Sequence, residues 1–261
     1  MKKIASWFLM NLGRSLPSLP KVHAVANRLL WPMHEKLRLG GGVVDVLGLK
    51  MELDPAECVD RNLWFTPHLY DEDEIEFALD NIKDIDVFID AGANIGFWSL
   101  RIAKEKPNVQ VVAVEANPRT AEILKKNVGL NQLTNITVVN KGLAAEKGTL
   151  SLSCGQHGNR GGDSFKFNHD EGSTISVDVL RLRDLCNVLY IDKIGFIKMD
   201  IEGMEYEVLE EFFRGAELNM WPKYICIEMT HDHNILNLLD ENGFRLLHSY
   251  RENSVFVNAN L

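Results

Sequence analysis

The stretch VFIDAGANIG, residues 87–96, decides the fold of this 261-residue chain. Its apolar start is typical of a short buried strand, and two glycines, Gly92 and Gly96, bracket a turn that opens a helix. A dinucleotide-binding turn would read G-x-G-x-x-G, but here Asn94 replaces the middle glycine. Asp90, at the end of the strand, would repel a pyrophosphate and attract a cationic amine. The turn therefore favours a nucleoside that carries a zwitterionic amino-acid group.

A second acidic residue ends the next predicted strand. Glu115 follows the apolar stretch 109–114. In nucleoside-binding α/β folds, a carboxylate at this position accepts hydrogen bonds from the ribose hydroxyls. Two acids at successive strand ends are more typical of a nucleoside site than of two solvated side chains.

Strands and helices alternate along the rest of the chain. Strands are predicted at 87–90, 109–114, 136–139, 194–199 and 224–228, and helices at 96–104, 117–130, 204–213 and 233–242. Near-continuous apolar strands between helices indicate an α/β fold whose mainly parallel sheet is covered by helices on both faces. Residues 244–249 and 255–257 are predicted to form an antiparallel edge. Ligands of such a sheet bind at the carboxyl ends of its strands.

Three segments outside this alternation have their own signals. Residues 40–42 are glycines that form a joint, residues 43–54 alternate as in a β-hairpin, and 71–82 is an acid-fronted helix. The segment 155–172 holds five glycines and few aliphatic residues. We expect it to be either a lid over the substrate or a mobile insertion.

Composition excludes several classes of protein. Hydrophobic residues make up 46% and charged residues 25% of the chain, which excludes disorder as the main state. The net charge of −9 argues against a nucleic-acid partner, because phosphate binding depends on clustered Lys and Arg. Four cysteines without a CxxC pair predict reduced thiols in a cytoplasmic protein.

Residues 1–38 are basic, unlike the remainder. They hold seven Lys and Arg against one acidic residue, a net charge of +6 that leaves −15 elsewhere. Apolar residues from Ile4 to Leu16 have helical spacing but are too interrupted to span a membrane. We expect this helix to pack on the protein or on a second subunit. The alternative is peripheral contact with the inner face of an anionic membrane; a signal peptide fits less well, since Arg14 and Lys21 follow the apolar run.

Three motifs together resemble one family. The motifs VFIDAGANIG, VVAVEANP (residues 111–118) and FIKMDIEGMEYEVL (residues 196–209) are similar to those of the FkbM family of S-adenosylmethionine-dependent methyltransferases. The third motif is the specific one, because the family carries a K-x-D-x-E-G-x-E element there. The resemblance covers about residues 43–250. It implies a Rossmann-like class I methyltransferase fold.

The resemblance also implies a domain division and a cofactor. The methyltransferase domain would span 41–261, after a basic helical segment at 1–40. The cofactor would be S-adenosyl-L-methionine, with Asp90 near its amino-acid portion, Glu115 at the ribose, and backbone contacts beside the adenine. The implied cofactor-binding residues are Asp90, Gly92, Asn94, Gly96, Glu115, Ala116, Lys141, Gly142 and Asp200.

The residues expected to act on the methyl acceptor follow the fourth and fifth predicted strands. Methyl transfer to a hydroxyl is an in-line displacement in which the acceptor loses its proton, so a nearby base is useful. Asp200, Glu228 and His231 are the predicted catalytic residues; the imidazole titrates near neutral pH, and desolvation can raise the pKa of Asp200. Alternatively, Asp200, Glu202 and Glu228 would hold Mg²⁺. Nothing in the spacing of these residues along the sequence requires a metal, and we expect none.

The predicted activity is O-methylation of a hydroxyl on a glycan, glycolipid or related natural product, as in polysaccharide biosynthesis. An NAD-dependent oxidoreductase is disfavoured by Asn94 and Asp90, as argued above. A non-catalytic nucleoside-binding module is the other alternative. It is disfavoured because a pure binding site has little need for the crowded acids Asp200, Glu202 and Glu228.

Overall fold

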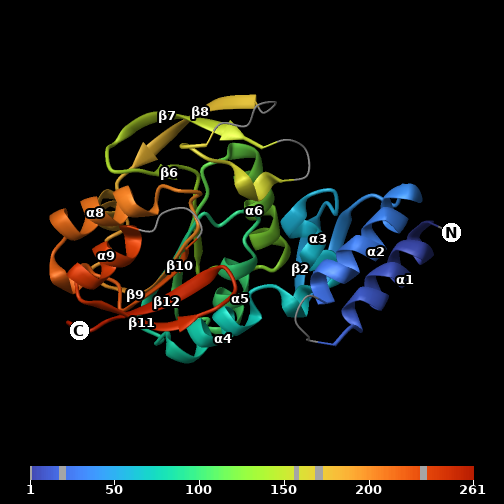
Figure 1. Cartoon of the computed structure of the whole chain (residues 1–261), viewed down its shortest axis with the longest axis horizontal. Coiled ribbons are helices and arrows are strands. Elements are labelled where there is room, and N and C mark those ends of the chain that lie inside the picture. Colours follow the sequence, from blue (N-terminus) through green and yellow to red (C-terminus); the bar gives the residue numbers. More distant parts are fainter. Residues whose placement is uncertain (1, 18–21, 156–158, 168–172, 230–233) are drawn as a thin grey trace. The chain divides into compact units, whose positions relative to one another are not determined.

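A seven-stranded sheet forms the centre of the computed structural model of this chain (Figure 1). The structure describes residues 2–17, 22–155, 159–167, 173–229 and 234–261. The strands of the sheet are β3 (Val87–Ala91), β4 (Gln110–Val114), β5 (Ile136–Val139), β9 (Ile194–Met199), β10 (Tyr224–Glu228), β11 (Phe244–Ser249) and β12 (Asn253–Asn258). Their order is β11-β12-β10-β9-β3-β4-β5, parallel from β10 to β5, with β12 antiparallel to both of its neighbours. The predicted fold class and its antiparallel edge are confirmed.

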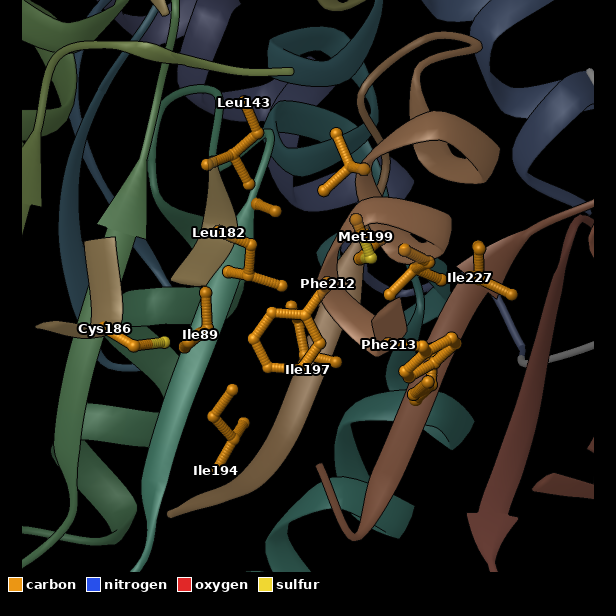
Figure 2. Close-up of a cluster of buried hydrophobic side chains, with 14 of the residues drawn as sticks. Ile89, Leu143, Leu182, Cys186, Ile194, Ile197, Met199, Phe212, Phe213 and Ile227 are labelled. Atoms are coloured by element: carbon orange, nitrogen blue, oxygen red, sulfur yellow. The ribbon is translucent and has the colours of Figure 1, made fainter. Parts of the chain in front are cut away.

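Helices cover both faces of this sheet because its central strands bury side chains on both sides. On one face, Phe88 stacks on Trp98 of α5 (Phe97–Glu105), and Phe196 contacts Phe77 of α4 (Glu72–Asn81). α6 (Pro118–Leu130) packs on the same face through Leu124. On the other face, a large apolar cluster joins the sheet to α7 (Leu182–Val188), α8 (Glu205–Gly215) and α9 (Asn234–Glu241) (Figure 2).

The strand order places a ligand site at a definite edge of the sheet. From β3 the chain proceeds through β4 and β5 on one side, and it later adds β9 and β10 on the other. The order therefore reverses between β3 and β9, where α/β sheets open a crevice beyond the carboxyl ends of the strands. Asp90 lies at the end of β3, and residues 92–96, 115–117 and 200–205 follow strands that end at this edge.

A three-stranded sheet was not predicted from the sequence. Its order is β6-β8-β7, with β6 (Gly142–Leu143), β7 (Gly148–Cys154) and β8 (Ser173–Leu180). The signal was missed because β7 and β8 expose much of their length and contain no long apolar run. Part of the expected lid lies against this sheet, since Ser164 and Ser153 exchange backbone hydrogen bonds of 2.9 and 3.0 Å. Residues 156–158 and 168–172 of that segment lie outside the described residues.

Contacts divide the chain into two units, one of Met1–Glu72 with Gly155–Gly161 and one of Asp73–Cys154 with Gly162–Leu261. The first contains α1 (Lys2–Arg14), α2 (Val22–Lys36), the hairpin β1 (Gly42–Val46) and β2 (Leu49–Leu53), and α3 (Cys58–Phe65). The sequence placed the boundary at residue 40, but the hairpin packs on α3, which contacts α1 and α2. The seven-stranded sheet therefore belongs to the second unit. None of the described helices is both long and apolar enough to cross a membrane.

Candidate active site

The loop after β3 is shaped by three residues with left-handed backbones. The φ angles are 80° at Gly92, 49° at Asn94 and 93° at Gly96. A Cβ atom on Gly92 would lie 1.8 Å from the carbonyl oxygen of Asp200, which follows β9. The loop is fixed to the neighbouring strand as well, because the N–H groups of Gly92 and Ala93 donate to the Val114 carbonyl at 3.0 and 2.9 Å. Glycine at position 92 thus lets the ends of β3 and β9 meet.

Asp90 lies beneath this loop and is almost fully buried. Its Oδ2 accepts hydrogen bonds from the Ser99 backbone N–H at 3.1 Å and from the Ser99 hydroxyl at 2.6 Å, which ties β3 to the first turn of α5. Burial raises the pKa of Asp90, and the charge of Lys198 opposes that rise. Because Oδ2 accepts both hydrogen bonds from Ser99, we expect the amine of the cofactor to bind Oδ1.

Glu115 connects the loop after β3 to the start of α6. Its Oε2 accepts from the Asn94 N–H and its Oε1 from the Asn117 N–H, both at 2.8 Å. Burial raises the pKa of Glu115 to about 7, the two N–H donors lower it, and the charges of Asp163 and Asp90 raise it further. Two backbone donors leave each oxygen a second lone pair for a ligand hydroxyl.

One atom in this region is buried and has no partner among the described residues. It is Oδ1 of Asn94, whose backbone N–H already donates to Glu115. A buried acceptor is costly to leave unpaired, so an acceptor of this kind indicates a missing donor. A ribose hydroxyl or an ammonium group supplies such a donor, and the loop therefore fits a nucleoside that carries an amino acid.

The predicted adenine side lies where β5 passes into β6. The Lys141 side chain is directed to Asp178 of β8, with Nζ and Oδ2 3.4 Å apart, so only its backbone remains for a ligand. Gly142 is buried, and a Cβ there would lie 2.6 Å from the Phe165 ring. Ala116 follows Glu115, and the Asn140 side-chain amide donates to the carbonyls of both, at 3.2 and 2.8 Å.

Sequence reasoning gave no role to three side chains around this site. Asp163 accepts from the Asn117 side-chain amide at 2.6 Å, and Phe165 lies on Gly142. Both come from the glycine-rich segment, which carried no periodic signal. The third, Lys198, is the first residue of the K-x-D-x-E-G-x-E element but was given no role there; its buried Nζ lies 2.8 Å from Oδ2 of Asp200.

Three carboxylates gather at the ends of β9 and β10. Oxygen atoms of Asp200, Glu202 and Glu228 lie within 4.8 Å of one another. Burial raises the pKa of Glu202 to about 8, the charges of Asp200, Glu228 and Glu205 raise it further, and Lys198 lowers it. Such a group can accept hydrogen bonds from several hydroxyls and take up a proton, and its oxygen atoms are also of the type that binds a divalent cation. His231 lies outside the described residues.

The position of Glu202 depends on Glu205, the last acid of the D-I-E-G-M-E sequence. Glu205 is buried, and its two oxygens accept from the N–H groups of Ile201 at 2.8 Å and Gly203 at 2.9 Å. The side chain thereby closes the turn in which Glu202 adopts φ 51°. Burial raises the pKa of Glu205, and the two N–H donors lower it. The Glu205 side chain thus stabilises the turn by binding its backbone. Asp200 and Glu202 are the acids of this segment that lie at the site.

The substitution Glu205→Ala is expected to destabilise the protein strongly. It leaves two N–H groups of a buried turn without acceptors, at a cost of about 1–3 kcal/mol each, so the free energy of unfolding falls by about 2–6 kcal/mol. Urea unfolding measures this change. The control is Glu210→Ala in the same helix, where a largely exposed i,i+4 pair with Arg214 is lost and the expected change is below about 1 kcal/mol. Equal effects of both substitutions would mean that Glu205 does not hold the turn.

The site can now be compared with known proteins. Residues 90–246 match the family described as the methyltransferase FkbM domain. Methyltransferase sdnD of Sordaria araneosa is 29% identical over 188 residues, which cover 60% of this chain and 68% of that protein. Methyltransferase 1 of Beauveria bassiana is 26% identical over 172 residues, which cover 56% and 67%. Among solved structures, M. jannaschii TYW2 in complex with AdoMet is 16% identical, covers 84% of this chain and 87% of its own, and has a TM-score of 0.46.

Proposed function

The chain belongs to the FkbM methyltransferase family and is an S-adenosylmethionine-dependent methyltransferase; on that premise, we propose that it methylates a hydroxyl group of a glycan, a glycolipid or a related natural product. The two alternatives considered from the sequence, an NAD-dependent oxidoreductase and a non-catalytic nucleoside-binding module, do not agree with this family. The observation that carries the proposal is the group of three carboxylates at the ends of β9 and β10.

The cofactor residues take the following proposed roles. Glu115 and the unpaired Oδ1 of Asn94 accept hydrogen bonds from the ribose hydroxyls, and Asp90 offers Oδ1 to the ammonium group of the methionine portion. Gly92 and Gly96 let the loop pass close to Asp200 and Leu124, where a Cβ would clash. The backbone of Lys141 and Gly142, next to Ala116, borders the adenine. S-adenosylmethionine, when bound, supplies a methyl group on a sulfonium centre. The residues named above hold the cofactor in one orientation.

The carboxylate group suits a hydroxyl acceptor for a chemical reason. An alcohol is a weak nucleophile at neutral pH and must give up a proton as it attacks. Asp200 is held by Lys198 beside the cofactor loop, so it orients the acceptor hydroxyl. Glu202 lies next to it and takes the proton, while Glu228 receives a neighbouring hydroxyl of a polyhydroxylated acceptor. His231 stays a predicted base.

A divalent cation on the same three carboxylates would be a second route to the same reaction. It would lower the pKa of a bound hydroxyl instead of accepting its proton directly. The two routes differ in their response to chelators. Both lead to an O-methyl product.

Transfer of a labelled methyl group from S-adenosylmethionine into fractionated envelope and small-molecule extracts tests the proposal. We expect label in ether-linked O-methyl groups of a hydroxyl-rich fraction, and transfer without loss in EDTA if Glu202 itself takes the proton. Label recovered only on nitrogen or carbon would overturn the acceptor class.

The variant Glu202→Gln tests the role of the carboxylate. Transfer should fall by about 10²–10⁴, the usual contribution of a general base, while the Kd for S-adenosylmethionine stays within about twofold. Glu210→Gln, on an exposed part of α8, is the control and should leave both values unchanged. Full activity of Glu202→Gln would remove Glu202 from the reaction.

A further inference from the structure

The first two helices expose an unusual amount of apolar surface. Seven of the nineteen large hydrophobic side chains that are exposed among the described residues lie between residues 4 and 37. On α1 they are Ile4, Trp7, Phe8 and Leu12, on α2 they are Leu29 and Met33, and Leu37 directly follows α2. Both sets have helical spacing, and each therefore lies along one side of its helix. We call these seven side chains the outer face.

The fold of the first unit uses the opposite sides of these helices. On α1, Leu9 is buried, and a Cβ on Gly13 would lie 2.5 Å from the carbonyl oxygen of Phe65 in α3. On α2, Ala26 and Leu30 are buried, as is His34. The outer face is therefore apolar surface that the unit does not need for its own core.

The two helices present the outer face together. α1 and α2 contact each other and both contact α3 (Figure 1). The Lys2 ammonium group donates to the Arg38 carbonyl at 3.4 Å, so the start of α1 lies beside the residues that follow α2. Two adjacent helices with one apolar side each form a patch, and contiguous exposed patches mark surfaces that bind a partner or a membrane.

Basic side chains lie along the same two helices. Those with described exposed positions are Lys2, Lys3, Arg28, Lys36 and Arg38. Arg14 belongs to the interior instead, since it donates to the carbonyls of Trp64 and Asp45. With a net charge of +6 on residues 1–38 and −15 on the remainder, an anionic surface attracts this segment alone.

The charge of residues 1–38 also distinguishes between two candidate partners for the patch, a second copy of the chain and an anionic bilayer. A second copy of the chain would bring two segments of +6 together, and the like charges would oppose the contact. A bilayer with anionic lipids attracts the basic groups and accepts Trp, Phe and Leu side chains at its headgroup boundary.

We infer that the outer face of α1 and α2, with its basic residues, binds the surface of an anionic lipid bilayer. The helices lie in the plane of the interface, with Trp7 and Phe8 at the boundary between headgroups and acyl chains and the basic side chains at the phosphates. This inference rests on exposure, spacing and charge, and it is independent of the identity of the methyl acceptor.

Sedimentation of the full chain with vesicles tests the inference. The vesicles contain phosphatidylcholine alone or phosphatidylcholine mixed with phosphatidylglycerol. We expect binding to the mixed vesicles at low salt and loss of binding at high salt, since the attraction is screened. No binding to the mixed vesicles, or equal binding to phosphatidylcholine alone, would overturn the inference.

Two pairs of variants locate the binding surface. Trp7→Ser with Phe8→Ser removes two aromatic side chains that are 61% and 59% exposed, and the partition coefficient should fall on the order of tenfold or more. The matched control is Val188→Ser with Tyr190→Ser, at sites 71% and 91% exposed in the other unit, which should bind like the unchanged protein. Thermal unfolding and the Kd for S-adenosylmethionine should be unaffected in both.

The charged residues are tested in the same assay. Lys3→Glu with Arg28→Glu should lower the partition coefficient at least about 25-fold, because each basic residue near the surface contributes about fivefold. Lys83→Glu with Lys126→Glu, which makes the same change outside the segment, is the control and should have little effect. If the aromatic variant instead converts a dimer to a monomer and neither protein binds vesicles, the outer face is an interface between copies and the inference is wrong.

Discussion

The substitution Gly92→Ala is expected to abolish methyl transfer, with a loss of at least about 10²-fold in kcat/KM. An added Cβ would lie 1.8 Å from the Asp200 carbonyl oxygen; the backbone fixes the position of the Cβ, and the oxygen is itself a backbone atom. Neither can turn aside as a side chain would, so the loop after β3 or the segment after β9 must shift. A shift near 1 Å at a reacting centre costs about this factor. The φ of 80° adds about 1–2 kcal/mol of strain for any residue with a Cβ.

The same chain offers a matched glycine-to-alanine control. Gly129 lies in α6, and a Cβ there would meet nothing within 4 Å. Gly129→Ala should therefore leave activity unchanged and stabilise the protein by up to about 1 kcal/mol. Steady-state kinetics with urea unfolding of both variants measure the difference. Near-normal turnover of Gly92→Ala would show that the ends of β3 and β9 need not meet in the active enzyme.

The contact between these strand ends illustrates which part of the site the sequence predicts. Apolar strands followed by Asp90, Glu115 and Asp200 placed three acids at one edge of a sheet, because parallel strands end together. The structure has all three there. What each acid contacts depends on side chains distant in the sequence. Ser99 lies in the next helix, and its two hydrogen bonds to Asp90 leave no trace in a periodic pattern.

Lys198 shows a second limit of sequence reasoning. Five of the six residues of β9 fit a buried apolar strand, so the pattern treats the lysine as an interruption. In the structure its ammonium group lies among carboxylates, 2.8 Å from Asp200, and its charge lowers the pKa of both Asp90 and Glu202. A buried cation is tolerated only where such partners exist. Asp200 follows the same strand, but Asp90 lies opposite Lys198 on β3 and is brought there only by the fold.

The outer parts of the chain were less predictable for a different reason. The strands β7 and β8 pair with each other over seven residues, yet both expose polar side chains. Such strands are specified by pairing and not by an apolar face, so hydrophobic periodicity does not reveal them. The hairpin β1–β2 was predicted, but its association with α3 was not. That association reflects tertiary contacts, which group the hairpin with α1, α2 and α3 in one compact unit.

The pH dependence of cofactor binding is expected to depend on Glu115. Its pKa in the folded protein is about 7, raised from 4.5 mainly by burial, with Asp163 and Asp90 adding to the rise and the N–H groups of Asn94 and Asn117 opposing it. A ribose hydroxyl that donates to Glu115 favours the ionised carboxylate. Affinity for S-adenosylmethionine should therefore fall as pH drops below about 7, by up to tenfold per pH unit.

Folding stability should respond in the opposite sense. Because the folded pKa lies above the unfolded one, Glu115 contributes most to stability when it is protonated, below about pH 4.5. That contribution, about 3 kcal/mol, is lost as pH rises from about 4.5 to about 7. Ionisation of Glu115 therefore lowers the folding stability of the cofactor-free protein, although the cofactor binds the ionised form. Cofactor binding restores the lost stability.

The substitution Glu115→Ala should remove this linkage together with most of the affinity. It deletes the acceptor of the proposed ribose contact and leaves the N–H groups of Asn94 and Asn117 unpaired, so the Kd for S-adenosylmethionine should rise about 10²-fold or more. Titration calorimetry at pH values on either side of 7 measures both effects. Glu115→Gln separates them, since an amide keeps one acceptor but cannot ionise, and its weaker binding should be independent of pH. Glu146→Ala, at an exposed position, is the control. Unchanged affinity in Glu115→Ala would place the nucleoside elsewhere.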